Sequence, residues 1–312
     1  MKHNHKHLAT TLLVTLALFL TSCSVPTGYE GGEVKEPSDV TVDGKSVKDD
    51  GEKATGNPNG KTEKETAEVT IEETVLLDEA DVKITAKKLE DGFLGPKLKL
   101  LIENNSGKNL TFQDRGTSVN GYMVDALLSA DVASGKKTND EITFSQSALD
   151  ICGIKTIADM EISFHIYDDD WETYLDSAPI VLKTSAADGY TYVFDDSGSA
   201  AYDAGGIKIV IKGLSDEDSL LGKEIVVYID NESGRNITVQ NRDLSVNGFM
   251  NGASFSCDVS AGKHAVDTIT LFSSDLEENE IENIENVELS FHIFDADSWD
   301  TIADSDTVTV NF

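Results

Sequence analysis

The chain contains one long pattern twice, and this internal repeat limits its possible folds more than any other feature. The stretch "ENNSGKNLTFQDRGTSVNGYM" returns as "DNESGRNITVQNRDLSVNGFM". The offset stays at 127 positions from Asn104 and Asn231 to His165 and His292 without a gap. About half of the aligned positions are identical, as expected of a tandem duplication. The sequence therefore predicts two copies of one domain rather than a solenoid of short repeats.

Each copy is rich in short segments of β-branched and aromatic residues that alternate with polar residues. Examples are "DVKITAKKL", "KLKLLIEN" and "MEISFHIYD" in copy one, and "GIKIVIKGL", "EIVVYIDN" and "VELSFHIFD" in copy two. Alternation buries one face of a strand, which indicates antiparallel sheets packed face to face. Only "SQSALDICGI" and "SSDLEENEI" predict a helical turn, each with an inward leucine, Leu149 or Leu276. We predict an all-β fold.

Seven or eight short strands in about 110 residues are typical of an immunoglobulin-like sandwich. We therefore predict two tandem immunoglobulin-like antiparallel β-sandwiches at residues 75–185 and 191–312. Each is the size of one compact domain.

The first residues, "MKHNHKHLATTLLVTLALFLTSC", combine a basic start with an apolar run that is too short to span a bilayer permanently. We predict a signal peptide at 1–22. The segment Leu20–Cys23 resembles the bacterial lipobox. This resemblance implies a diacylglycerol on Cys23 that anchors the chain at the extracytoplasmic face of the cell membrane. An ordinary secretory signal with a chance cysteine is the alternative.

Residues 23–74 hold three of the five prolines and are dense in charged and small residues. Little of this segment could be buried, so we predict a disordered acidic linker. About fifty flexible residues give a mean reach of ~40 Å.

The lipobox, the acidic linker and the strand that runs into "NNSGKN" together resemble surface lipoproteins of Gram-positive bacteria with tandem immunoglobulin-like (telokin-like) domains. The resemblance covers most of the chain and implies a fold and a location, but no activity. The inter-sheet cysteine pair of antibody domains is missing.

The formal net charge of −32 excludes nucleic acid as a natural partner, because such a surface repels phosphate backbones. We interpret it as a solvated surface. Cys152 aligns with Asn279 and Cys257 aligns with Ala130, so no disulfide is duplicated. Two buried free thiols are expected, and a bridge between the domains is the alternative.

Aspartates follow the "SFHI" strand in both copies, and residues two apart on an extended chain face the same way. Such carboxylate pairs suit a hard cation such as Ca²⁺, although the glycine and distal glutamate of an EF-hand are absent. The candidate metal ligands are Asp168, Asp170, Asp295 and Asp297. A solvated strand end is the expected alternative, and we predict no other cofactor.

His165 and His292 occupy equivalent places in "SFHI" and are expected to be packed or half-exposed structural residues. No spacing of ligands suits zinc, and no serine stands in a nucleophile elbow, so we predict no enzyme. Trp171 and Trp299 are expected in the core, with a stacking platform for a sugar as the alternative.

Asn104, Asn109, Asn231 and Asn236 each begin an N-x-[S/T] sequon. In a bacterial protein we interpret them as turn residues.

The pairs Asn120-Gly121 and Asn247-Gly248 predict type I′ hairpin turns, although turns at the end of a sandwich are also where such domains bind.

The sequence thus predicts a membrane-anchored, non-catalytic binding or spacer module of the bacterial cell envelope. The expected partner is an unidentified envelope protein or glycan. A lipoprotein that captures a solute or Ca²⁺ is the alternative.

Overall fold

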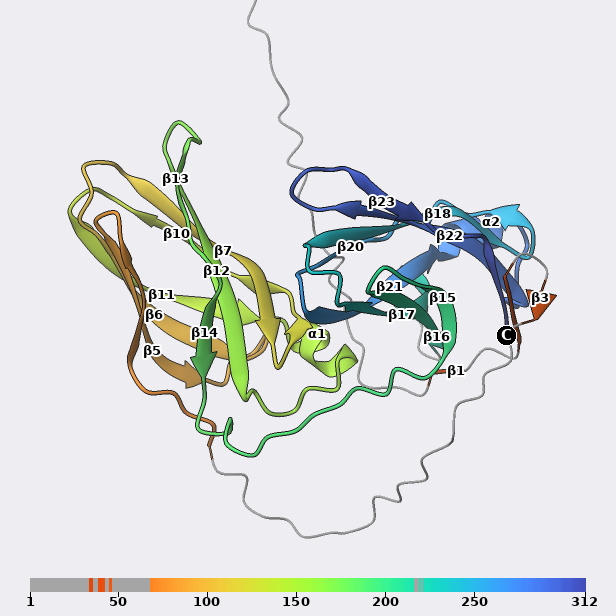
Figure 1. The fold of residues 1–312 in the computed structure, drawn as a ribbon, viewed down its shortest axis with the longest axis horizontal. Helices are drawn as coiled ribbons and strands as arrows, with labels where there is room; N and C mark the ends of the chain where they lie inside the picture. The colour runs from red at the N-terminus through yellow and green to blue at the C-terminus, as the bar shows by residue number, and fades with distance from the viewer. Residues whose placement is uncertain (1–33, 36–38, 43–44, 47–67, 216–218, 220) are drawn as a thin grey trace, which may run out of the picture.

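The computed structural model describes residues 34–35, 39–42, 45–46, 68–215, 219 and 221–312. This part of the chain is built from β-strands with two short helices, which confirms the all-β class (Figure 1). None of its helices is long and apolar enough to cross a membrane. The predicted signal peptide and Cys23 lie outside the described residues.

Repeat 1 consists of two antiparallel sheets that pack face to face. The strands of the first sheet are, in order, β4 (Thr74–Glu79), β5 (Val82–Glu90), β6 (Lys97–Asn104), β11 (Lys136–Phe144) and β9 (Ala126–Leu127). The second sheet runs from β10 (Ser129–Val132) through β7 (Leu110–Val119) to β12 (Asp159–Asp168). Both β13 (Thr173–Asp176) and β14 (Ile180–Lys183) pair with β12.

Repeat 2 uses the same strand order. Its first sheet contains β15 (Ser199–Ala204), β16 (Ile207–Ser215), β17 (Gly222–Asn231) and β21 (Lys263–Phe272). Its second sheet contains β20 (Ser256–Val259), β18 (Ile237–Val246) and β22 (Asn286–Asp295), and β22 pairs with β23 (Thr301–Asp304) and β24 (Val308–Asn311).

Three strands lie in the segment that the sequence predicts to be disordered. They are β1 (Val34–Lys35), β2 (Asp39–Val42) and β3 (Lys45–Ser46), and β2 pairs with β24 along its whole length. The prediction that all of 23–74 is disordered is therefore wrong for the residues of these three strands. Valine alternates with polar residues in β2, and β24 offers unpaired backbone groups at the edge of the sheet.

The alternating sequence pattern places one side of each strand in the core. Along β6 and β12, every second residue is buried. The large buried side chains include Phe112, Phe144 and Phe164 in repeat 1 and Phe291 in repeat 2. The predicted helical turns are present as α1 (Gln146–Ile151) and α2 (Ser273–Glu278), and the Ser145 side chain caps α1.

The two Asn-Gly turns have the same backbone geometry but different surroundings. The φ angles are 52° and 85° at Asn120 and Gly121, and 50° and 84° at Asn247 and Gly248, as a type I′ turn requires. The first turn leads into β8 (Tyr122–Met123) and the second into β19 (Phe249–Met250). Tyr122 is 5% exposed, whereas Phe249 is 50% exposed.

Tyr122 is buried because the two repeats pack against each other at this hairpin. Its ring centroid lies 5.1 Å from that of His264 and 5.8 Å from that of Tyr192 in the connecting segment. A salt bridge of 3.0 Å joins Lys263 to Glu161 across the same contact. Val226 and Val266 of repeat 2 belong to the hydrophobic cluster of repeat 1. Figure 1 shows the two repeats side by side.

Asn104 and Asn231 are fully buried amides that tie together the two sheets of their sandwiches. The Asn104 Nδ2 donates to the carbonyl oxygens of Lys108 at 2.8 Å and Val132 at 2.7 Å. Its Oδ1 accepts the backbone N–H and the hydroxyl of Ser106. Asn231 makes the equivalent bonds in repeat 2. Their burial agrees with a structural role for these two sequon residues.

Asn104→Ala should lower the free energy of unfolding by about 2–3 kcal/mol, because it leaves buried carbonyl and hydroxyl groups without partners. Chemical denaturation of the purified chain measures this change. The control is Asn105→Ala, which removes an exposed side chain next to it and should stay within about 0.5 kcal/mol. Equal losses in the two variants would contradict the role assigned to Asn104.

Asp267 on β21 is a buried carboxylate beside the contact between the repeats. Burial raises its pKa from the usual 3.8 to about 7, and the charge of Asp125 in repeat 1 adds to the shift. Burial also raises the pKa of Asp125 to about 6. The native state therefore binds protons that the unfolded chain releases, so stability falls as the pH rises from about 4 to 7.

Asp267→Asn should remove this loss, since the amide keeps the acceptor for the Thr268 N–H but carries no charge. At pH 8 we expect a gain on the order of 3 kcal/mol, and at pH 4 little change, measured by denaturation at both values. Asp140→Asn at the equivalent, half-buried position of repeat 1 is the control, since Asp140 bonds the Glu141 N–H in the same way. A variant that is less stable than the wild type at pH 8 would contradict the prediction.

Candidate functional site

The second sheet of each repeat carries the same rows of side chains on its face opposite the core, where they range from buried, as for Phe294 at 5% and Thr238 at 6% exposure, to fully exposed. In repeat 1, strand pairing places Tyr167 beside Thr111, and Thr111 beside Asp131. The next row contains His165, Gln113 and Ser129. Successive residues of a strand face opposite ways, so these residues share the face opposite the core.

Repeat 2 repeats both rows with one change, Phe in place of Tyr. The first row contains Phe294, Thr238 and Asp258, and the second contains His292, Gln240 and Ser256.

The two tryptophans extend these rows outward. Trp171 is 72% exposed and Trp299 is 73% exposed, so the prediction that they lie in the core is wrong. The Trp171 ring stacks on Tyr167 with centroids 5.2 Å apart and planes 14° apart. The Trp299 ring stacks on Phe294 at 5.5 Å and 17°. Each indole therefore covers an aromatic ring with one face and leaves the other face open.

The backbone of the loop after the strand turns the tryptophan outward. Trp171 and Trp299 both have φ of 64°, in the left-handed region that bulky residues rarely occupy. The Trp171 N–H donates to the Asp168 carbonyl at 2.9 Å, and the Trp299 N–H donates to the Asp295 carbonyl at 2.9 Å. A backbone conformation of this kind persists only where surrounding contacts enforce it.

A histidine continues each stack on the inner side. The ring centroids of His165 and Tyr167 lie 5.4 Å apart, as do those of His292 and Phe294. The His165 Nδ1 lies 2.6 Å from a carboxylate oxygen of Asp176. The His292 Nδ1 lies 2.6 Å from a carboxylate oxygen of Asp304. Both histidines are half-buried, as expected from the sequence.

We call each set of three rings an aromatic ladder. The ladders are Trp171, Tyr167 and His165 in repeat 1, and Trp299, Phe294 and His292 in repeat 2.

Two of the proposed calcium ligands hold the tryptophan loops in place. The Asp168 Oδ1 accepts the N–H groups of Asp170 and Glu172 at 3.1 Å each, and its Oδ2 lies 2.5 Å from the Lys108 ammonium. The Lys108 ammonium holds the pKa of Asp168 below its usual value.

Asp295 plays the same part in repeat 2. Its Oδ1 accepts the N–H groups of Asp297 and Ser298, and Arg235 lies 3.9 Å away. The bond from the Ser298 N–H is the largest cause that lowers the pKa of Asp295.

The other two proposed ligands, Asp170 and Asp297, lie on the exposed part of each loop. The Asn236 Nδ2 donates to the Asp297 carboxylate at 3.3 Å. Across the described residues, no group of three or more His, Cys, Asp or Glu side chains is placed to hold a metal ion. Calcium binding stays a prediction.

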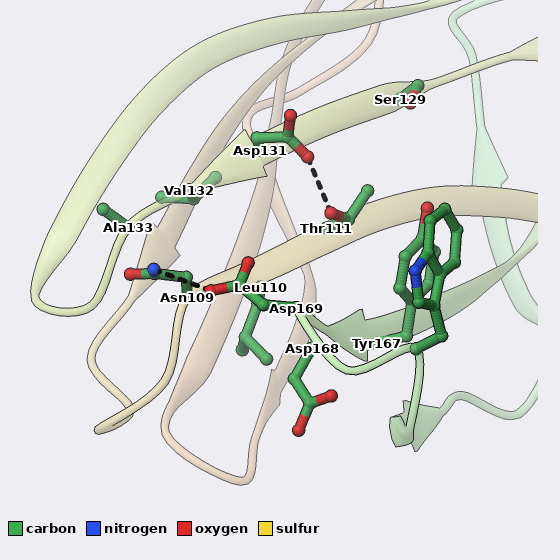
Figure 2. A pocket seen from close by; sticks show the side chains of 11 residues that line it. Asn109, Leu110, Thr111, Ser129, Asp131, Val132, Ala133, Tyr167, Asp168 and Asp169 are labelled. Atoms are coloured by element: carbon green, nitrogen blue, oxygen red, sulfur yellow. Dashed lines mark hydrogen bonds between the residues drawn. The ribbon is translucent and has the colours of Figure 1, made fainter. Parts of the chain in front are cut away.

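A groove of about 600 Å³ lies beside the ladder of repeat 1. In Figure 2, Asn109 bonds Asp169 at 2.9 Å on one side, and Thr111 bonds Asp131 at 2.6 Å on another. The lining residues are Asn109, Leu110, Thr111, Ser129, Asp131, Val132, Ala133, Tyr167, Asp168, Asp169 and Trp171.

The site combines a flat, open aromatic face with hydroxyl, amide and carboxylate groups. Such a surface can bind a ligand by stacking and by hydrogen bonds. The cysteines do not take part, because Cys152 and Cys257 are buried thiols outside any disulfide, and burial raises the pKa of Cys152 to about 12.

Sequence reasoning singled out the histidines and the aspartates of the loops but missed Thr111, Gln113 and Asp131. A signal was available, because these three residues are identical in the two copies. Some exposed positions of the repeat differ, such as Asn105, which aligns with Glu232, whereas others, such as Asn109 and Asn236, are identical.

Comparison with known proteins gives no family. No family model matches the chain, and no curated protein matches it. Among solved structures, the chain is similar to a transglutaminase from red sea bream, with 8% sequence identity and a TM-score of 0.18. The match covers 70% of this chain and 30% of the transglutaminase chain. A likeness this weak carries no argument about function.

Proposed function

We propose that the protein is a membrane-anchored, non-catalytic binding module of the bacterial cell envelope that displays two immunoglobulin-like sandwiches. The observation that carries this proposal is the equivalence of the two aromatic ladders and of the polar rows beside them. The polar residues of these rows are identical in the two copies although they lie on the face of the sheet opposite the core. Function is a reason to keep such residues in both copies.

The strand order supports the immunoglobulin-like assignment. In repeat 1, β4, β5, β6, β11 and β9 form one layer, and β10, β7 and β12 with β13 and β14 form the other. Two antiparallel layers of short strands in about 110 residues are typical of this architecture. The kinship with surface lipoproteins of Gram-positive bacteria belongs to the same proposal.

The sequence before the described domains supports the anchor. A signal peptide at 1–22 followed by Cys23 would place a diacylglycerol at the start of the mature chain. In producing cells, Cys23→Ser should move the protein from the membrane fraction to the medium, as measured by immunoblotting of the two fractions. A Cys23→Ser chain that stays in the membrane fraction would contradict lipid anchoring through this residue.

The state of the polar groups in the groove favours binding over catalysis. Asp131 accepts a hydrogen bond from Thr111, Asp168 is paired with Lys108, and Asp169 accepts a hydrogen bond from Asn109. Each carboxylate is thus held in place by a donor. Fixed polar groups around an open aromatic ring are suited to orienting a ligand.

The proposal predicts that isolated cell envelopes bind the purified chain through the tryptophans. Trp171→Ala combined with Trp299→Ala should weaken this binding by about 10-fold or more, since exposed aromatic anchors carry much of the energy of recognition. The measurement is a sedimentation assay with labelled protein.

Phe93→Ala is the matched control, because Phe93 is 99% exposed and lies in the loop between β5 and β6, outside the ladders. Envelope binding that is unchanged in the double variant would contradict the proposal. Calcium capture would be favoured instead if a calcium chelator abolished envelope binding and the double variant still bound as the wild type does.

A further inference from the structure

We propose that each aromatic ladder is a binding subsite for an uncharged glycan chain, with one sugar ring stacked on the open face of Trp171 in repeat 1 and of Trp299 in repeat 2. This inference rests on the proposed function, since it names the ligand class of the same surface.

The shape of the platform fits one face of a sugar ring. A pyranose has a face of C–H groups and an edge of hydroxyl groups, so it suits a flat aromatic ring with a polar border. Trp171 offers such a face because its other side already covers Tyr167. Trp299 does the same over Phe294. Both rings are held in position before the ligand arrives, so little side-chain entropy is lost on binding.

The border of the platform has the groups that bind hydroxyls. Asp131 uses one carboxylate oxygen for Thr111, and Asp169 uses one for Asn109. An ionised carboxylate has about four lone-pair sites, so both can still accept bonds from sugar hydroxyls. Ser129 adds an exposed hydroxyl on the neighbouring strand.

The size of the groove agrees with a short run of sugar rings. Its volume of about 600 Å³ lies within the range of sites that hold ligands of a few hundred daltons.

The surface charge disfavours anionic glycans. Asp131, Asp169 and Asp170 are exposed around the ladder of repeat 1, and Asp258, Asp297 and Asp300 are exposed around that of repeat 2. A uronic acid or a phosphate group bound there would lie among several carboxylates of the same charge, which repel it. The chain as a whole carries −32 and adds to this repulsion.

The geometry also favours an uncharged ligand over a cationic peptide. Recognition of a cation by aromatic rings works best when several rings enclose it. Here each repeat presents a single open ring, and a basic residue, Lys108 or Arg235, already lies beside the loop aspartate.

Intrinsic fluorescence can test the inference directly, because the chain has two tryptophans and both belong to the ladders. Purified full chain is titrated with oligomers of glucose and of N-acetylglucosamine as uncharged probes. Polygalacturonate serves as the anionic probe and poly-lysine as the cationic probe. At least one uncharged oligomer should change the emission with saturation, and polygalacturonate should not.

Variants locate the contact. Trp171→Ala and Trp299→Ala should each remove one of two sites, and the double variant should lower the affinity at least 10-fold by calorimetry. Thr111→Val with Thr238→Val should weaken binding several-fold while thermal unfolding stays close to that of the wild type, since these side chains position Asp131 and Asp258. Phe93→Ala should bind as the wild type does.

Three results would overturn the inference. The first is saturable binding of poly-lysine with none of the uncharged oligomers, and the second is oligomer binding that the double tryptophan variant keeps. The third is envelope binding that depends on the tryptophans although no uncharged oligomer binds, which would leave the proposed function standing. If neither envelope binding nor oligomer binding depended on the tryptophans, the proposed function would be contradicted as well.

Discussion

The buried amide of Asn104, with its copy Asn231, is the contact on which the exposed surface depends. By bonding the Lys108 and Val132 carbonyls, Asn104 joins the end of β6 to the start of β7 and the end of β10, so it links the two sheets. The same bonds fix the turn before β7. That turn places Lys108 on Asp168 and Asn109 on Asp169. Lys108 and Asn109, which the Asn104 side chain positions, thereby hold the loop that carries Trp171.

Repeat 2 has the same series of contacts, except that an arginine takes the place of the lysine that pairs with the loop aspartate. Asn231 bonds the carbonyls of Arg235 and Val259, Arg235 replaces Lys108, and Asn236 bonds Asp297. The loop is one residue longer, yet the tryptophan reaches the same φ and stacks on the same sheet position. Two loops of different length thus place their tryptophans in the same stacked, outward position. This agreement supports a shared binding role for the two tryptophans.

Packing between the repeats uses the β8 hairpin of repeat 1 and the start of β21 in repeat 2. The hairpin of β8 is buried because Tyr122 meets His264, whereas the equivalent Phe249 of repeat 2 is half exposed. One sequence element thus serves as an interface in one copy and as a free turn in the other. The tryptophans of the ladders, on the β10–β7–β12 face and on its copy, stay open to solvent when the repeats pack together.

Much of the fold follows from the sequence because strand periodicity and turn chemistry are local. The alternation in "KLKLLIEN" gives the buried face of β6, and the strand segments and both short helices were predicted from such patterns. Trp171 could not be placed in this way, since its outward position depends on a loop conformation set by Asp168. The same limit applies to β2, which is ordered by the edge of β24, a partner more than 250 positions away in the sequence. Contacts between residues far apart in the sequence determine the positions of Trp171 and β2, and local sequence patterns carry no information about such contacts.

The most direct test of the account is solvent quenching of tryptophan fluorescence in two single-tryptophan chains, Trp171→Phe and Trp299→Phe. Each chain then reports on one ladder alone. The account predicts that acrylamide quenches both equally, at a rate close to that of the unfolded chain, and that both emit at the long wavelength of a hydrated indole. Short-wavelength emission with protection from acrylamide in either chain would mean a buried tryptophan, and would contradict two equivalent, open platforms.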